Sequence, residues 1–272
     1  MGLQKMKIRV ITLFSGYDSQ CLALDRLKEN HPDFDYTLCG WSEIDKFAIQ
    51  AHNLIYPQWA DRNLGDVSKI DWESYPHLKG CDLMTYSFPC TSVSAAGKQA
   101  GLEKGSGTAS SLLWECEKAI RILRPKYLLM ENVKALVSKK FMPFFQEWID
   151  LIDGKYNYHS YWKILNATQY GIPQNRERCF MISIRGDIMR GYDFPEPFPL
   201  ELTLDDVLED EVDEKYYLKN ERIEGLLTST IDEMRKKNGY KFKAKKRYET
   251  ANSLTSKCGG SRKTDNFIDE TS

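Results

Sequence analysis

The 272-residue sequence has little histidine, no closely spaced cysteines and no long apolar run. Its four histidines and seven scattered cysteines, none of them in a Cys-x-x-Cys pair, argue against a disulfide framework and a zinc site. No stretch is apolar enough to span a bilayer, and the basic N-terminus lacks the small-residue cleavage site of a secretory signal. We therefore expect a cytoplasmic protein with free thiols, no bound metal and no membrane partner.

The sequence also lacks a net charge. Its 38 lysines and arginines balance 39 aspartates and glutamates, which leaves a formal charge of -1 and no global basic field. The charge is nevertheless separated locally. Residues 201–214 hold eight acidic residues and no basic one, and residues 234–247 hold eight basic residues and no acidic one. Any contact with a polyanion is therefore expected in a local groove.

Apolar runs alternate with helical segments over the first two-thirds of the chain, and the character changes after Pro195 and Pro197. This alternation predicts an α/β fold with a doubly wound, mostly parallel sheet. The change at the prolines predicts a first domain over residues 1–194 and a second region over 195–272. We expect strands at 9–14, 35–41, 82–87, 127–130, 158–165 and 179–184, and helices at 19–29, 45–54, 112–123 and 219–237.

The first candidate site residues are Phe14, Ser15 and Gly16, at the end of the first predicted strand. Ligands of doubly wound folds bind just outside the strand ends, and a glycine there lets a ligand approach the backbone. A full Gly-x-Gly-x-x-Gly is missing, because Asp18 and Ser19 stand where further glycines are expected. A plain tight turn is therefore an equal interpretation.

Acidic residues follow the second predicted strand. Glu43 or Asp45 at this place can accept hydrogen bonds from both hydroxyls of a ribose. The alternative is that they only begin the next helix, whose dipole favours acidic residues at its N-terminus.

A proline–cysteine pair follows the third predicted strand, in Ser87-Phe88-Pro89-Cys90-Thr91. A cysteine after proline is held on a rigid turn, and a nearby helix N-terminus favours its thiolate. The glycine- and serine-rich stretch 94–111 behind it is a candidate lid. The alternative for Cys90 is a small buried hydrophobic residue without catalytic use.

Charged residues follow the later strands. Glu131 comes after the fourth predicted strand, at the same sheet edge as Cys90, which gives a thiol and carboxyl pair. Arg176 and Arg178 are two residues apart, and in an extended segment this spacing puts both guanidinium groups on one face, where they suit a phosphate or a polarised base. A solvated salt-bridge network is the alternative for these charges.

Taken in order, these motifs resemble the DNA cytosine-5 methyltransferase family. They are Phe-x-Gly at 14–16, Pro-Cys at 89–90, Glu-Asn-Val at 131–133 and Gln-x-Arg-x-Arg at 174–178. The resemblance runs from about residue 8 to residue 184 and includes 42–45, 65–67, 94–101 and 171–178. It implies the fold of methyltransferases that use S-adenosylmethionine, this compound as cofactor, and double-stranded DNA as partner.

The resemblance also implies a role for each site residue. Cys90 adds to C6 of cytosine, Glu131 holds or protonates N3, and Arg178, supported by Arg176, contacts the O2 edge and a phosphate. The target base is flipped out of the duplex, since its reacting atom is inaccessible within the stack. Implied cofactor-binding residues are Phe14, Ser15, Gly16, Glu43, Ile44, Asp66, Val67, Ser87 and Pro89, and implied substrate-binding residues are Phe88, Ser94 and Gln174.

The sequence departs from the family pattern in two respects. Residues 17–19 replace expected glycines, and Thr91 replaces a glutamine. The two last family motifs are not found, so residues 195–272 are expected to form a partial target-recognition region, in a truncated product or with a second chain that supplies the rest. Cytosine methylation in RNA and a non-catalytic subunit remain the alternative functions.

Overall fold

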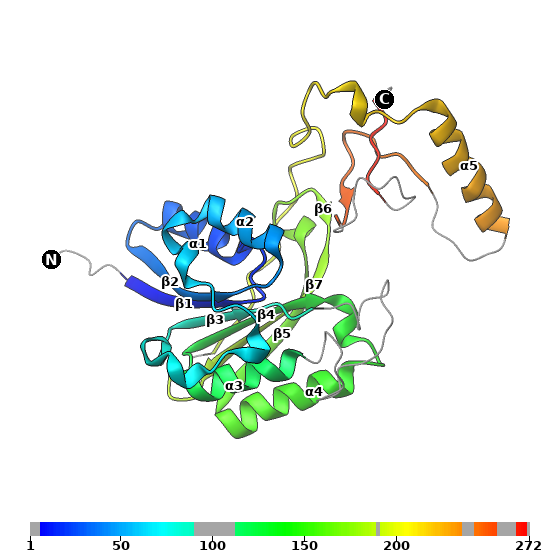
Figure 1. Ribbon diagram of the computed structural model, residues 1–272. Helices are drawn as coiled ribbons and strands as arrows, with labels where there is room; N and C mark the ends of the chain where they lie inside the picture. Colours follow the sequence, from blue (N-terminus) through cyan, green and yellow to red (C-terminus); the bar gives the residue numbers. More distant parts are fainter. Residues whose placement is uncertain (1–5, 90–111, 189–190, 236–241, 255–264, 271–272) are drawn as a thin grey trace. The chain divides into compact units, whose positions relative to one another are not determined.

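The computed structural model describes residues 6–89, 112–188, 191–235, 242–254 and 265–270 (Figure 1). The chain divides into two compact units, one formed by Met1–Ile164 with Arg178–Phe194 and the other by Leu165–Glu177 with Pro195–Ser272. The division falls between Phe194 and Pro195 and also assigns Leu165–Glu177 to the second unit. Within the described ranges, no helix is both long and apolar enough to cross a membrane.

A six-stranded sheet forms the centre of the first unit, in the order β2-β1-β3-β4-β7-β5. Neighbouring pairs among β2, β1, β3 and β4 are parallel, and β7 runs antiparallel to β4. This confirms the predicted α/β fold with a mostly parallel sheet. The strands are β1 Met6–Leu13, β2 Phe34–Ser42, β3 Leu83–Tyr86, β4 Tyr127–Val133, β5 Tyr158–Asn166 and β7 Glu177–Arg185.

Helices cover both faces of this sheet. Helices α1 (Ser19–Asn30) and α2 (Lys46–Ile55) lie on one face, and α3 (Leu113–Leu123) and α4 (Met142–Asp150) lie on the other (Figure 1). Each face has its own apolar core: one includes the buried side chains of Val10, Leu38 and Trp41, and the other those of Met84 and Trp148. Two cores on one sheet are what the doubly wound arrangement requires.

Helix α4 and the end of β4 differ from the sequence-based expectations. No element was expected around Met142–Asp150, which forms α4 because Phe145 and Trp148 bury completely against the sheet. Strand β4 was expected to end at Met130, and this was wrong. It continues to Val133 because β7 pairs with its last residues, so Glu131 lies within the strand.

The second unit contains a two-stranded sheet and one longer helix. Strand β6 (Gln174–Asn175) pairs in parallel with β8 (Ala251–Asn252), and α5 spans Asn220–Arg235. The locally separated charges meet here, since Arg247 Nε lies 2.7 Å from Asp205 Oδ1. This ion pair joins the acidic segment to the basic one.

Candidate cofactor and catalytic site

The turn that follows β1 has an unusual backbone. Phe14, Gly16 and Asp18 all have positive φ angles, of 55°, 58° and 68°. Ser15 N donates to Ser42 O at the end of β2, at 3.1 Å, and thereby ties the turn to the neighbouring strand. A Cβ added at Gly16 would meet no atom within 4 Å, so open space borders the backbone at this point. The backbone at this glycine is therefore open to a ligand beside the turn, and its use by a cofactor stays a prediction.

The carboxylate of Glu43 faces this turn. Its Oε2 accepts from Gly16 N at 2.9 Å, and its Oε1 accepts from the backbone N–H groups of Ile44 and Asp45 at 2.7 and 2.8 Å. Asp45 instead caps α2, because its Oδ1 accepts from the N–H groups of Phe47 and Ala48. The structure thus separates two acids that the sequence left equivalent: Glu43 borders the turn and Asp45 begins the helix.

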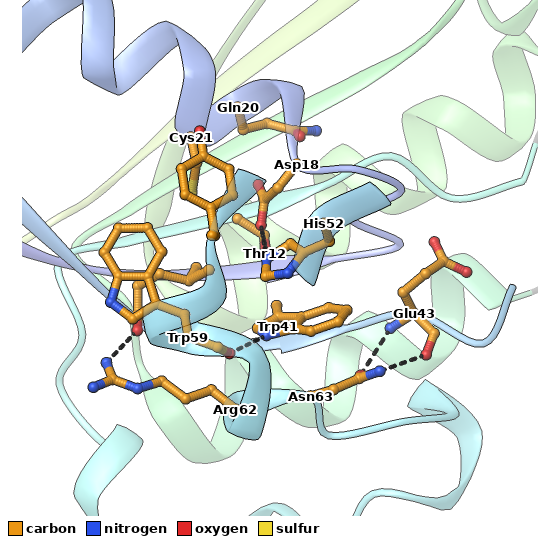
Figure 2. A network of polar contacts seen from close by, with 12 residues as sticks. Thr12, Asp18, Gln20, Cys21, Trp41, Glu43, His52, Trp59, Arg62 and Asn63 are labelled. Atoms are coloured by element: carbon orange, nitrogen blue, oxygen red, sulfur yellow. Dashed lines mark hydrogen bonds and ion pairs between the residues drawn. The ribbon is translucent and has the colours of Figure 1, made fainter. Parts of the chain in front are cut away.

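The Asn63 side chain forms hydrogen bonds with the backbone of Glu43 (Figure 2), and sequence reasoning missed this residue. Its Oδ1 accepts from Glu43 N at 3.3 Å and from Gly65 N at 2.9 Å, and its Nδ2 donates to Glu43 O at 3.2 Å. One amide side chain therefore links the Glu43 segment to the segment that leads to Asp66. An isolated asparagine carries no motif, so only the folded structure identifies this role.

Asp66 and its neighbours occupy the loop after Asn63. The Asp66 carboxylate accepts from Ser68 N and Ser68 Oγ at 3.0 and 2.7 Å, and these bonds hold its pKa below the ordinary value. Val67 is buried in the core, whereas the Ile44 side chain is 70 % exposed. Of Ile44 and Val67, Ile44 is therefore the one that offers apolar surface to a ligand.

The residues around the turn fit a cofactor that carries a ribose. A carboxylate has about four acceptor positions, so Glu43 can accept from one ribose hydroxyl in addition to the three backbone groups. Ser15 Oγ is buried and has no hydrogen-bond partner among the described atoms. Open space at Gly16, acceptor capacity on Glu43 and exposed apolar surface on Ile44 together suit the nucleoside part of such a molecule.

The strand that ends before the proline–cysteine pair is held by Asn132. Asn132 Nδ2 donates to Phe88 O at 3.0 Å, and both residues are almost completely buried. Asn132 Oδ1 accepts from Val133 N at 2.9 Å, which fixes the orientation of the amide. The backbone leading into Pro89 is thus fixed from β4. Cys90 itself, like Ser94 in the candidate lid, lies outside the described residues.

An ion pair between β7 and β4 and the contacts of Ser87 lie near the Phe88 carbonyl in the sequence of strands. Arg178 Nε lies 3.0 Å from Glu131 Oε1, with side-chain exposures of 19 % and 28 %. Ser87 N lies 3.5 Å from Leu13 O, and Ser87 Oγ accepts from Gln20 Nε2 at 3.4 Å, so the end of β3 adjoins the end of β1. Glu131 lies on β4, Arg178 on β7 and the Phe88 carbonyl just after β3, so these groups come from three strands of one sheet.

Arg176 and Gln174 belong to the second unit. Arg176 N donates to Asn166 Oδ1 at 3.1 Å, and Arg176 O accepts from Ala167 N at 3.0 Å. Gln174 Oε1 is buried without a hydrogen-bond partner among the described atoms. That these residues join Arg178 at a substrate stays a prediction. Across the part of the chain that the structure describes, no group of three or more His, Cys, Asp or Glu side chains could hold a metal ion.

The chain is similar to several known methyltransferases. It is 47% identical over 163 residues to the type II methyltransferase M2.ScrFI of Lactococcus lactis subsp. cremoris, an alignment that covers 60% of this chain and 44% of the relative. It is 32% identical over 206 residues to the type II methyltransferase M.HhaI of Haemophilus parahaemolyticus, covering 74% of this chain and 57% of the relative. The chain thus spans about half the length of these curated relatives.

Solved structures share the fold at low sequence identity. The DNMT2 mutant of Spodoptera frugiperda matches with a TM-score of 0.68 at 17% identity, covering 95% of this chain and 72% of that one. The methyltransferase EhMeth of Entamoeba histolytica matches with a TM-score of 0.67 at 17% identity, covering 90% and 69%.

The family model of the C-5 cytosine-specific DNA methylase matches residues 8–272, nearly the whole chain. The match contains the turn after β1, the proline–cysteine pair, the Glu131 strand and the paired arginines in the order that the sequence analysis found. By this match the chain belongs to the C-5 cytosine-specific DNA methylase family.

Proposed function

We propose that the chain transfers a methyl group from S-adenosylmethionine to C5 of cytosine in double-stranded DNA. The observation that carries the proposal is the ion pair between Glu131 and Arg178, whose Oε1 and Nε atoms lie 3.0 Å apart. The next residue on β4, Asn132, donates a hydrogen bond to the Phe88 carbonyl. A carboxyl group, a guanidinium and a fixed backbone acceptor are the groups that a cytosine ring requires along its N3, O2 and N4 edge.

Cytosine C5 is a weak nucleophile, so the reaction needs a temporary covalent bond. The Cys90 thiolate adds to C6, and the ring electrons move toward N3, where the Glu131 carboxyl group donates a proton or a hydrogen bond. S-adenosylmethionine supplies the methyl group when bound. After C5 has been methylated, water takes the C5 proton, the ring electrons expel the Cys90 thiolate from C6, and the proton on N3 returns to Glu131.

Arg178 keeps Glu131 in place for this task. The ion pair is mostly sheltered from water, so it orients the carboxyl group more strongly than an exposed pair can. In the proposal, the planar guanidinium of Arg178 also contacts O2 of the base. In the proposal, Arg176 and Gln174 of the second unit add contacts to a phosphate and to the substrate, and Ser94 contacts the substrate from the candidate lid.

The Phe88 carbonyl selects cytosine over thymine. A carbonyl oxygen has two lone pairs, and Asn132 uses only one of them. The second can accept from the exocyclic amine of cytosine, whereas thymine presents an acceptor at the same place. Since the reacting atom of the base is inaccessible within the stack, the target base is flipped out in this proposal.

The cofactor-binding residues are proposed from the turn after β1. Glu43 accepts from a ribose hydroxyl, Ile44 packs against the base, and the Phe14–Gly16 backbone borders the methionine part, with Ser87 and Pro89 closing the other side. Asp66 and Val67 contribute the loop beside the adenine. Residues 1–194 are proposed as the catalytic and cofactor-binding part, and residues 195–272 as a target-recognition region.

The experiment is transfer of tritiated methyl groups from S-adenosylmethionine to double-stranded DNA of mixed sequence, with RNA as a parallel acceptor. The proposal predicts label in DNA that elutes as 5-methylcytosine after digestion, and none with Cys90→Ser. Label in RNA alone would show an RNA methyltransferase. Absence of label in either polymer together with a normal heat of cofactor binding would show a non-catalytic subunit, or one that needs a second chain.

A further inference from the structure

A buried polar group that the proposed mechanism does not use lies beneath the turn after β1 (Figure 2). It consists of Thr12 on β1, Asp18 at the start of α1 and His52 on α2, and none of the three is exposed to solvent. Thr12 Oγ1 donates to Asp18 Oδ2 at 2.8 Å, and His52 Nε2 lies 3.7 Å from the same oxygen. Side chains from three elements thus converge on one carboxyl group.

Neighbouring side chains orient the His52 imidazole so that its Nε2 atom faces Asp18. The imidazole stacks on the indole of Trp41, with ring centroids 3.7 Å apart and an interplanar angle of 21°, and its Nδ1 lies 3.3 Å from Asn53 Oδ1. The Nε2 edge is therefore left for Asp18. Neither His52 Nε2 nor Asp18 Oδ1 has a hydrogen-bond partner among the described atoms. A buried acceptor without a partner is costly, so this arrangement is expected to have a role.

Among the described residues, the titratable groups that act on Asp18 and His52 supply no compensating positive charge. Burial raises the pKa values of the Cys21 thiol and of the Tyr36 and Tyr56 hydroxyls, which therefore stay uncharged. Asp25 accepts from both tyrosine hydroxyls, at 2.7 and 2.8 Å. Burial also raises the pKa of Asp18 to about 6 and lowers that of His52. Burial thus disfavours the charged form of both groups.

The backbone around Asp18 depends on this carboxyl group. Asp18 has φ 68° and ψ 56°, a left-handed conformation that is unfavourable for most residues with a Cβ and more accessible to aspartate. Asp18 N donates to Ser15 O at 2.8 Å, so the conformation of Asp18 is transmitted to the turn. The Glu43 carboxylate holds the turn at Gly16, and the Asp18 side chain holds its other end to β1 through Thr12.

Resting on the proposed function, we propose that Asp18 is a positioning residue for the cofactor. Together with Thr12 and His52, it holds the Phe14–Asp18 turn in the conformation that receives S-adenosylmethionine. Asp18 does not touch the cofactor in this proposal; it acts through the backbone of the turn. A left-handed backbone alone is not sufficient, because the side chain provides the connection to β1 and α2.

Three substitutions separate the backbone from the side chain. Asp18→Gly keeps the left-handed conformation and loses the side-chain contacts. Asp18→Asn keeps the left-handed conformation, a carbonyl oxygen that can accept from Thr12 and an amide group near His52. Asp18→Ala loses both conformation and contacts. Ser19→Ala is the matched control, since Ser19 is the exposed next residue and its hydroxyl donates to Gln20 Oε1.

The test is calorimetric titration of the full chain with S-adenosylmethionine, combined with steady-state methyl transfer. We expect Asp18→Gly and Asp18→Ala to raise Kd and KM for the cofactor by about tenfold or more, the scale of a lost buried hydrogen bond. Asp18→Asn and Ser19→Ala stay within about threefold of the wild type, and KM for DNA is unchanged in all four. Thermal unfolding of each variant checks that it is folded, and a variant that does not fold is replaced by Thr12→Val, which removes the same hydrogen bond.

Wild-type affinity in Asp18→Gly would overturn the proposal, because the backbone conformation alone would then suffice. Loss of kcat or a higher KM for DNA with unchanged cofactor affinity would also overturn it. These outcomes leave the proposed function intact. A wild-type chain that binds no S-adenosylmethionine would instead overturn the proposed function and this inference together.

Discussion

The Glu131 carboxylate and the Arg178 guanidinium meet at 3.0 Å across the antiparallel pairing of β4 and β7. Arg178 pairs with Val133 in the strand register, so its side chain reaches back along β4 to Glu131 two residues away. The sequence separates these two residues by more than forty positions, and pairing of the strands brings them together. The ion pair therefore depends on β4 continuing past Met130.

Glu131→Gln is expected to lower kcat for methyl transfer by about a hundredfold, because an amide cannot donate the proton that N3 requires. Cofactor affinity stays the same, since the residues proposed for cofactor binding are other ones. If Arg178 acts through Glu131, Arg178→Ala lowers kcat by a smaller factor in the Glu131→Gln background than in the wild type. Asp82→Asn, which breaks the Lys126–Asp82 pair in the same unit, is the control and leaves kcat unchanged. Full additivity of the two losses in kcat would contradict a coupled pair.

Asn132→Ala is expected to destabilise the fold by about 1–3 kcal/mol, because the buried Phe88 carbonyl loses its donor. Methyl transfer falls as well, since the backbone before Pro89 and Cys90 is no longer fixed. Urea unfolding and kcat measure the two effects. Asn30→Ala removes an exposed side-chain bond to Arg26 O and should change stability by less than about 0.5 kcal/mol. An Asn132→Ala variant as stable and active as the wild type would show that Asn132 does not fix the backbone before Pro89.

Glu43 and Asp45 are expected to respond differently to substitution. Glu43→Gln leaves one carbonyl oxygen for three backbone donors and for ribose, so the Kd for S-adenosylmethionine rises by about tenfold. Asp45→Ala removes the cap of α2 and costs about 1 kcal/mol of stability, with little change in Kd. Calorimetric titration and urea unfolding of both variants check this. The opposite pattern, with affinity lost only in Asp45→Ala, would reverse the assignment.

Asp18→Asn is expected to change how stability depends on pH. Burial raises the folded-state pKa of Asp18 from 3.8 to about 6, so the folded protein binds a proton that the unfolded chain has released between these values. The contribution of this carboxyl group to stability is therefore fully present below about pH 4 and is lost as the pH rises through 6. The unfolding free energy of Asp18→Asn minus that of the wild type should then fall by up to about 3 kcal/mol from pH 8 to pH 4.

Urea unfolding across this pH range tests the dependence. Asp206→Asn is the contrasting variant, because hydrogen bonds from Thr203 lower the pKa of Asp206 and its contribution is lost as the pH falls. The two variants should therefore differ from the wild type with opposite pH trends. A difference for Asp18→Asn that does not change with pH would show that the carboxyl group titrates normally.

Much of the fold follows from local patterns in the sequence. Apolar runs and helical segments predict β1, α1, β2 and α2 within a few residues of their observed ends. The exceptions depend on tertiary contacts. Helix α4 is short and forms around two buried aromatic side chains, and the end of β4 is set by its pairing with β7.

The site could be predicted where a motif carries it and not where folding assembles it. The motifs predict Glu131, Arg178 and the proline–cysteine pair as site residues, and β4 and β7, which carry Glu131 and Arg178, are neighbours in the sheet beside β3. Asn63 and His52 belong to no motif, because their partners are far away in the sequence. Likewise, nothing local tells Glu43 from Asp45, since only the fold determines which carboxylate faces the turn.

The central claim is that Cys90 forms a covalent bond to cytosine during methyl transfer to DNA. Duplex DNA of mixed sequence, prepared with 5-fluorocytosine in place of cytosine, tests it directly, because fluorine at C5 cannot leave as a proton and the adduct persists. With S-adenosylmethionine present, the account predicts a protein–DNA conjugate whose single modified peptide contains Cys90, and none with Cys90→Ser. Methyl transfer to ordinary DNA without such a conjugate, or a conjugate at another cysteine, would contradict it.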